Sequence, residues 1–246
     1  RNIWHPDDTY GDDDVSILLG EAQFLKLVQE KIDGDGDSES VGLTLADAEG
    51  SVFTIQDAGL TVNPENVVDL IFSTGDEGGG VTVIGELIVD ESTVGTDQPT
   101  AVAPPGSRSV DGEFAQYFSG KGGEAIDVDT DGLSETLYSF ALSGVGIGSG
   151  LYALDQSDNA STDVDGDEYG KGAEINLWTV AGVVYGLAGS EDGGADPGEA
   201  LVQAYEDAVA AEDADAAADA LVAIQEASYF NIEVNDAGEV TFTQTP

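Results

Sequence analysis

The imbalance between acidic and basic residues constrains this chain more than any other feature. Fifty Asp and Glu residues face six Lys and Arg residues over 246 positions, which gives a formal net charge of -44. A chain this acidic stays unfolded when it lacks apolar residues, because it cannot bury enough surface to offset the entropy of ordering. Here 41% of the residues are hydrophobic, and they recur at strand-like and helix-like spacings. The sequence therefore predicts a folded, strongly acidic protein.

A saline environment reconciles this charge with a folded chain. At molar salt the Debye length shrinks to about 3 Å, so exposed carboxylates repel one another weakly and hold hydrated cations. The composition resembles that of proteins from extremely halophilic archaea, and this resemblance implies a habitat rather than an activity. We expect hydrated cations as partners, and we expect unfolding or dissociation when the salt falls to about 0.1 M.

Two classes of partner are not expected. Six basic residues are too few for a surface that binds nucleic acid phosphates. Membrane insertion is not expected either, because no apolar run approaches the roughly 18 residues of a membrane span. The chain begins with Arg1 and lacks Cys and Met, which favours removal of a leader segment and an extracellular or cell-surface location, or alternatively a place in a virion.

The pattern along the chain predicts a mainly β fold, an antiparallel sandwich or jelly-roll-like arrangement with an N-terminal helix and a C-terminal helical hairpin. Residues 1–14 form a polar arm. Residues 15–33 are expected to form an amphipathic helix, because apolar residues recur there at three- and four-residue steps, namely Val15, Leu18, Leu19, Ala22, Leu25, Val28 and Ile32. Short segments rich in β-branched and aromatic residues, GEFAQYFSG (112–120) among them, predict a β-rich body over 41–190, with a candidate boundary at 96–109.

The end of the chain carries clearer local signals. Asp196, Pro197 and Glu199 match an N-cap, a first helical position and a capping-box glutamate, and they open a helical hairpin over 196–229. A terminal β-hairpin over 230–246, packing on the body, is expected around the turn of residues 235–238.

One acidic segment has the spacing of a metal loop. Asp127, Asp129 and Asp131 alternate before a glycine, and Glu135 follows, so that their oxygens and the Leu133 carbonyl could surround one hard cation. The pattern resembles the DxDxDGxxD/E calcium loops of dockerins and thrombospondin type 3 repeats. It departs from an EF-hand because Tyr138 stands at position twelve. Calcium is therefore a candidate cofactor, and a solvated acidic turn is the alternative.

Weaker candidates follow the same reasoning. Two other segments have alternating carboxylates without the complete pattern, and they contain Asp163, Asp165 and Asp167, and Asp33, Asp35 and Asp37. For each of them, a solvated acidic surface loop is the alternative to an ordered metal site. Asn159 begins an N-glycosylation sequon.

The two tryptophans have different expected roles. Trp178 lies in an alternating segment, which favours core packing over ligand stacking. Ile3 and Trp4 are the apolar residues of the polar arm, and they either anchor a neighbouring subunit or fold back onto their own chain. The only histidine, His5, lies in the same arm, and we expect no catalytic residue.

The first functional hypothesis is a non-enzymatic structural subunit that assembles with copies of itself. The segment SVFTIQDAGLTV (51–62), followed by APPGSRSVDGEF (103–114), resembles the β-sandwich subunits of TasA and camelysin-like filaments. This resemblance, over about residues 41–118, implies an exported, polymerising subunit of an extracellular filament or surface layer. One alternative is a capsid or tail protein of a haloarchaeal virus. Another is a secreted binding protein or hydrolase with a structural calcium site.

Overall fold

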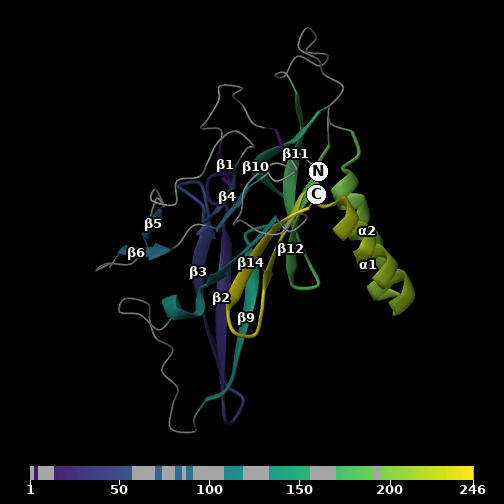
Figure 1. The fold of residues 1–246 in the computed structure, drawn as a ribbon. Helices are drawn as coiled ribbons and strands as arrows, with labels where there is room; N and C mark the ends of the chain where they lie inside the picture. Colours follow the sequence, from purple (N-terminus) through teal and green to yellow (C-terminus); the bar gives the residue numbers. More distant parts are fainter. Residues whose placement is uncertain are drawn as a thin grey trace.

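A computed structural model describes residues 3–4, 14–56, 70–73, 81–84, 87–90, 108–118, 133–155, 170–190 and 194–245. These residues form a mainly β fold with antiparallel sheets and a C-terminal helical hairpin (Figure 1), as the sequence predicts. No helix among them is long and apolar enough to cross a membrane.

A six-stranded antiparallel sheet forms the largest unit. Its strands run in the order β10-β11-β12-β13-β14-β8, which leaves β10 and β8 at the edges. Their bounds are β8 (Arg108–Glu113), β10 (Ile147–Leu154), β11 (Lys171–Val180), β12 (Val183–Ala188), β13 (Phe230–Val234) and β14 (Glu239–Gln244). The turn between β13 and β14 is the one expected from the sequence, since the Asn235 side chain accepts hydrogen bonds from the backbone of Ala237 and Glu239.

Smaller sheets complete the β structure. A three-stranded sheet has the order β3-β2-β9, and a second has the order β1-β4-β7, in which β4 and β7 are parallel. The strands β5 and β6 pair with each other. The bounds are β1 (Val15–Ser16), β2 (Leu25–Asp33), β3 (Ser38–Ala46), β4 (Phe53–Gln56), β5 (Leu70–Ser73), β6 (Val81–Ile84), β7 (Leu87–Asp90) and β9 (Leu133–Leu142).

The predicted N-terminal helix over 15–33 is wrong. Residues 15–16 form β1 and residues 25–33 form β2, the central strand of its sheet. Along β2 the buried side chains alternate, at Leu25, Leu27 and Gln29, and both strand edges are paired, with β3 and with β9. These backbone hydrogen bonds come from the neighbouring strand β3 and from β9, which lies about 100 residues further along the chain, and they override the helical spacing of the apolar side chains.

A second local prediction also needs correction. The segment 112–120 was expected to continue as a strand, but Ala115–Phe118 form a 3-10 helix, η2, directly after β8. Phe114 and Phe118 are buried there, so the tight turn places both rings in the core.

The main core contains residues of the six-stranded sheet and of the β1-β4-β7 and β3-β2-β9 sheets. Phe242 of β14 contacts Phe53 of β4 and Phe230 of β13, with ring centroids 5.2 and 5.6 Å apart. All three rings are fully buried. Other buried members come from both sides, including Leu25, Leu27, Leu45, Ile55, Ile175, Leu177, Val184, Ile232 and Val240.

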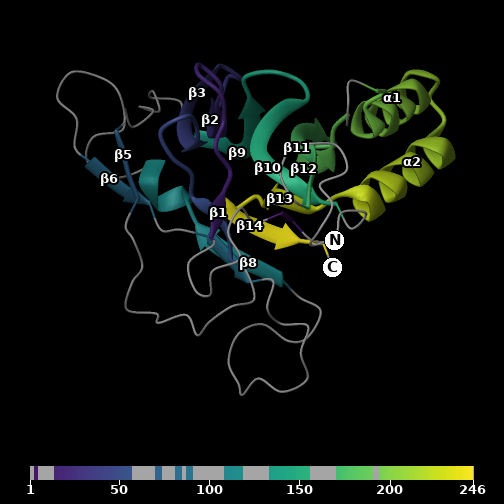
Figure 2. The ribbon, with the colours of Figure 1, turned by 90° about the horizontal axis from the view of Figure 1, so that it is seen from above.

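The helical hairpin covers part of the opposite face of the six-stranded sheet (Figure 2). It consists of α1 (Pro197–Ala210) and α2 (Ala214–Ala227), inserted between the neighbouring strands β12 and β13. Asp196 caps α1 by accepting a hydrogen bond from the backbone of Glu199 at 2.9 Å, as the sequence predicts. Trp178 is buried beneath the hairpin, which confirms its expected core role.

Candidate metal site

The β2–β3 turn brings three carboxylates together. Its residues, 33–37, read DGDGD, and Asp33 organises the turn. The Asp33 Oδ1 atom accepts hydrogen bonds from the backbone N–H groups of Asp35 at 3.2 Å, Gly36 at 3.0 Å and Asp37 at 2.9 Å. Short acidic side chains favour such turns because they can bond the backbone a few residues ahead. Gly36 has φ +95°, a conformation that only glycine adopts readily.

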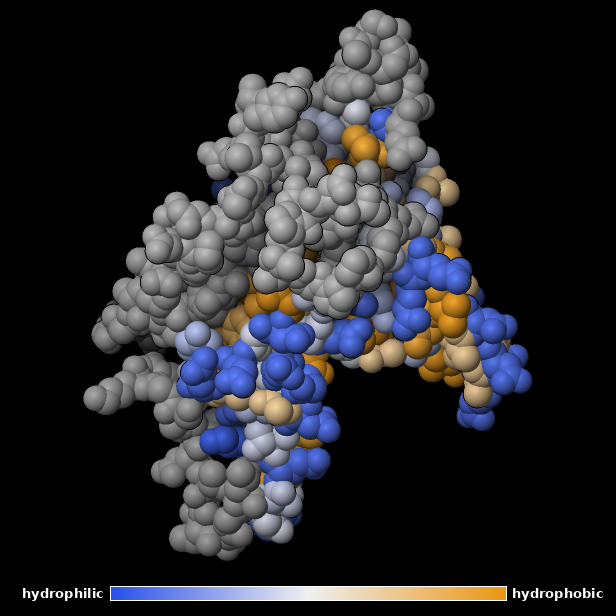
Figure 3. Space-filling model, viewed as in Figure 1, coloured by the Kyte–Doolittle hydropathy of each residue, from blue (hydrophilic) through white to orange (hydrophobic). Residues whose placement is uncertain are grey.

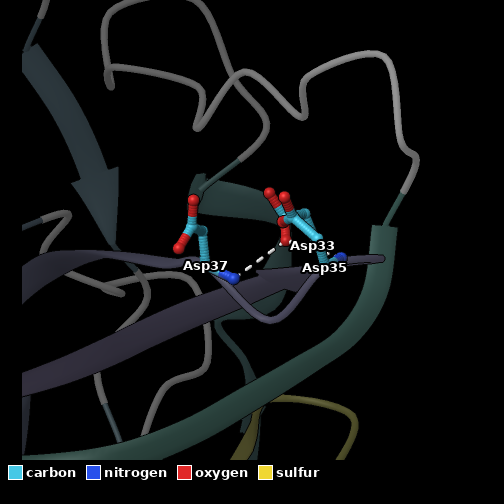
Figure 4. Close-up of side chains that lie close together, drawn as sticks. All are labelled: Asp33, Asp35 and Asp37. Atoms are coloured by element: carbon cyan, nitrogen blue, oxygen red, sulfur yellow. Dashed lines mark hydrogen bonds between the residues drawn. The ribbon is translucent and has the colours of Figure 1, made fainter.

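The three side chains gather on one side of this turn (Figure 4). One carboxylate oxygen from each of Asp33, Asp35 and Asp37 lies within 4.8 Å of the others. Asp35 and Asp37 are exposed and Asp33 is half-buried. The triad could therefore bind a metal ion that solvent reaches freely.

Interactions within the triad shift the pKa values of Asp33 and Asp35 in opposite directions. A side-chain hydrogen bond with Asp35 and the backbone N–H groups of the turn hold the pKa of Asp33 below its usual value. The same hydrogen bond raises the pKa of Asp35, and the charges of Asp33 and Asp37 raise it further. Asp35 therefore keeps its proton up to a higher pH than an ordinary aspartate does, and a bound cation would displace that proton.

The segment predicted as the strongest metal loop is described only at its end. Asp127, Asp129 and Asp131 lie outside the described residues. Leu133 begins β9 and is paired with Asp33 of β2, and the exposed Glu135 is paired with Ile32. The strand that follows the acidic segment 127–131 therefore starts beside the Asp triad, although about 100 residues separate the two along the chain.

The remaining predicted positions are not described. Asp163, Asp165 and Asp167 lie outside the described residues, as does the sequon residue Asn159. Their metal and glycosylation assignments stay predictions.

The predicted assembly residues Ile3 and Trp4 contact the edge of the six-stranded sheet in their own chain. Ile3 forms an isolated antiparallel bridge with Ala153 of β10 and is 2% exposed. The backbone N–H of Trp4 donates a hydrogen bond to the Tyr152 carbonyl oxygen at 2.8 Å, and the Trp4 and Tyr152 rings meet edge to face with centroids 6.2 Å apart. Their contact with a neighbouring subunit stays a prediction.

A cation completes the Trp4 contact. The Lys171 Nζ atom lies 4.3 Å from the centroid of the Tyr152 ring and 5.2 Å from that of the Trp4 ring. Sequence reasoning missed Tyr152 and Lys171, because nothing local marks them; β10–β11 pairing brings them to the arm.

Comparison of the chain with protein family models, with curated proteins and with solved structures gives no match.

Proposed function

We propose that this protein is a non-enzymatic, self-assembling structural subunit of an extracellular filament or surface layer in a halophilic archaeon. The observation that supports this proposal is the contact of Ile3 and Trp4 with β10, an edge strand of the six-stranded sheet. An edge strand presents unpaired backbone groups that can pair with an added segment, from the same chain or from another.

The contact of Ile3 and Trp4 with β10 combines burial with specific interactions, as expected for residues that hold a segment in place. Ile3 is almost completely buried, and Trp4 adds a backbone hydrogen bond, an aromatic pair and a cation–π contact. A neighbouring copy offers the same β10 surface, so exchange of the arm between copies would replace each contact by an identical one. Residues 5–13 join the anchor to the body, and an extended segment of that length can span about 30 Å.

We infer a β-sandwich of jelly-roll type, in which the six-stranded sheet faces the β1-β4-β7 and β3-β2-β9 sheets. The contacts of Phe242 with Phe53, and the burial of residues from all three sheets in one core, support this arrangement.

Assembly can be tested with two variants that carry the same type of substitution at positions of different burial. Ile3→Asp and Val145→Asp each replace a β-branched apolar residue by a carboxylate, but Ile3 is 2% exposed and Val145 is 81% exposed. In sedimentation velocity at molar NaCl, we expect large assemblies for the wild type and for Val145→Asp, and monomers for Ile3→Asp. A wild type that assembles no more than Ile3→Asp would overturn the proposal.

Microscopy separates the alternatives by the shape of the assembly. Negative staining at molar salt should show filaments or sheets. Icosahedral or tailed particles would instead assign the chain to a haloarchaeal virus, and stable monomers would favour the secreted binding protein or hydrolase.

We further propose calcium as the ion of the Asp triad. Calcium takes six to eight oxygens in flexible geometry, and three carboxylates on an exposed turn leave the other positions to water. Titration with Tb³⁺, followed by displacement with Ca²⁺, should show weaker binding for Asp35→Asn than for the wild type. Asp236→Asn is the matched control, because it neutralises an exposed aspartate in the turn of another β-hairpin, between β13 and β14. Equal affinities in Asp35→Asn and Asp236→Asn would contradict the assignment.

A further inference from the structure

The helical hairpin has a small core of its own, separate from the main core. It is docked through Val202 of α1 and Ile224 of α2, which contact the outer face of β11 and β12. The sheet contributes Trp178, Val180, Tyr185 and Leu187. Elsewhere the hairpin is mostly exposed, with Val209 and Val222 each about half exposed. Figure 3 shows hydrophilic residues on both helices beside an apolar strip.

Two features of this docking are unfavourable. The Trp178 Nε1 atom is buried and has no hydrogen-bond partner among the described residues, so the docked state carries the cost of removing this N–H from water. Glu212, in the turn between the helices, has φ +55°, a left-handed conformation that costs a non-glycine residue free energy.

The hairpin also concentrates negative charge. Lys171 is the last basic residue of the chain, so the hairpin has no cation of its own. Within 196–227 there are nine carboxylates: Asp196, Glu199, Glu206, Asp207, Glu212, Asp213, Asp215, Asp219 and Glu226. Asp196 and Asp213 cap the two helices, which stabilises them. Glu226 opposes folding because it lies in the last turn of α2, where a negative charge is unfavourable. Asp219 repels Asp215 as a like-charged i,i+4 partner, although Asp215 itself lies favourably in the first turn.

The topology allows the hairpin to leave without opening the sheet. It is inserted between β12 and β13, which pair directly through Val184 with Ile232 and Tyr185 with Asn231. The backbone hydrogen bond from Tyr229 to Gly186 closes the insertion at its base. These bonds do not require the helices, so the insertion can behave as a separate cooperative unit.

We propose that the helical hairpin is a salt-dependent latch. As the salt concentration is lowered, the two helices leave the outer face of β11 and β12 and unfold before the sheets do. The Debye length grows from about 3 Å at 1 M salt to about 10 Å at 0.1 M, so repulsion among the nine carboxylates strengthens as salt is removed. The small core under the hairpin opposes this repulsion with far fewer buried side chains than the main core. Release uncovers the apolar face around Trp178, Tyr185 and Leu187. The latch is a property of one chain and does not depend on the proposed assembly.

Hydrogen exchange measured by mass spectrometry on the full chain tests the order of release. As NaCl is lowered from about 3 M to 0.1 M, peptides of α1 and α2 should lose protection while those of β11, β13 and β14 keep it. In the Trp4→Phe variant, Trp178 is the remaining tryptophan, and its emission should shift to longer wavelength in the same step. Simultaneous loss of protection in the helices and the sheets would overturn the proposal.

A matched pair of variants tests the cause. One neutralises three exposed hairpin carboxylates, with Glu206→Gln, Asp219→Asn and Glu226→Gln, and the other neutralises three exposed carboxylates of the β body, with Glu49→Gln, Glu135→Gln and Asp236→Asn. The net charge changes equally. The hairpin set should lower the salt concentration at which Trp178 is released, and the body set should lower it less. An equal shift in both sets would show that total charge controls release, and would contradict a latch controlled by the hairpin.

Discussion

Truncation of Phe242 is the sharpest test of the core that joins the sheets. Phe242 of β14 is completely buried, and its ring meets Phe53 of β4 at an interplanar angle of 61° and Phe230 of β13 at 71°. Because β4 and β14 belong to different sheets, Phe242→Ala removes a contact between sheets as well as one within a sheet.

The expected loss of stability is large. Removing a buried phenylalanine ring costs about 3–5 kcal/mol, because apolar burial is lost and a cavity remains. Two aromatic pairs that each add about 0.5–1.5 kcal/mol place Phe242→Ala in the upper part of that range. The melting temperature of a chain of this length should fall by roughly 10 °C.

Urea unfolding at constant molar NaCl measures this loss, since urea is uncharged and leaves the screening of the carboxylates unchanged. Thr241→Ala is the control. Thr241 is the neighbouring residue on the opposite face, where its hydroxyl donates to Asp111 at 2.7 Å in an exposed bond worth about 1 kcal/mol or less. Combining Phe242→Ala with Phe53→Leu should give a coupling energy of about 0.5–1.5 kcal/mol. A loss below about 1 kcal/mol in Phe242→Ala, or no coupling with Phe53, would refute the facing of the two sheets.

Two further predictions concern the turns. Glu212→Gly should stabilise the helical hairpin by up to about 1 kcal/mol, because glycine adopts the left-handed backbone at φ +55° without strain, and a hairpin that loses hydrogen-exchange protection at higher salt than in the wild type would contradict this. Cation affinity at the Asp triad should fall when the pH is lowered from about 7 to about 4.5, because the raised pKa of Asp35 lets a proton compete with the cation at a higher pH than at an ordinary aspartate. Asp35→Asn should remove the part of the pH dependence that Asp35 contributes, and an affinity that is the same at both pH values in the wild type would show that Asp35 does not hold the cation.

Local signals predicted the C-terminal part of the fold because its contacts are close in sequence. Asp196 caps α1 through a residue three positions away, and Asn235 closes the β13–β14 turn through residues two and four positions away. Such bonds depend on residue type and spacing, which a single sequence displays.

The segment 15–33 shows where such reasoning fails. Leu25 and Val28 fit a helical stripe, whereas the alternate burial of Leu25, Leu27 and Gln29 fits a strand. The outcome is decided by β3 and β9, and β9 lies more than 100 residues away in the register of β2. Because the partners of a strand are not visible in its own sequence, apolar spacing alone selects the wrong structure.

The candidate metal site was predicted only in part, because one of its features depends on strand pairing. The spacing of Asp33, Asp35 and Asp37 made them a weaker metal candidate, with a solvated surface loop as the alternative, and the structure brings the three carboxylates together. The pairing of Asp33 with Leu133, which places the start of β9 beside this loop, depends on sheet register and leaves no mark on either segment alone.

The state of assembly of the wild-type chain at molar NaCl tests the central proposal most directly. Sedimentation velocity over a wide range of protein concentrations, with negative staining of the same samples, should show monomers converting to filaments or sheets as the concentration rises. A single monomeric species at every concentration in molar salt, with Ile3 and Trp4 docked on β10 of their own chain, would contradict the account of this protein as a self-assembling subunit.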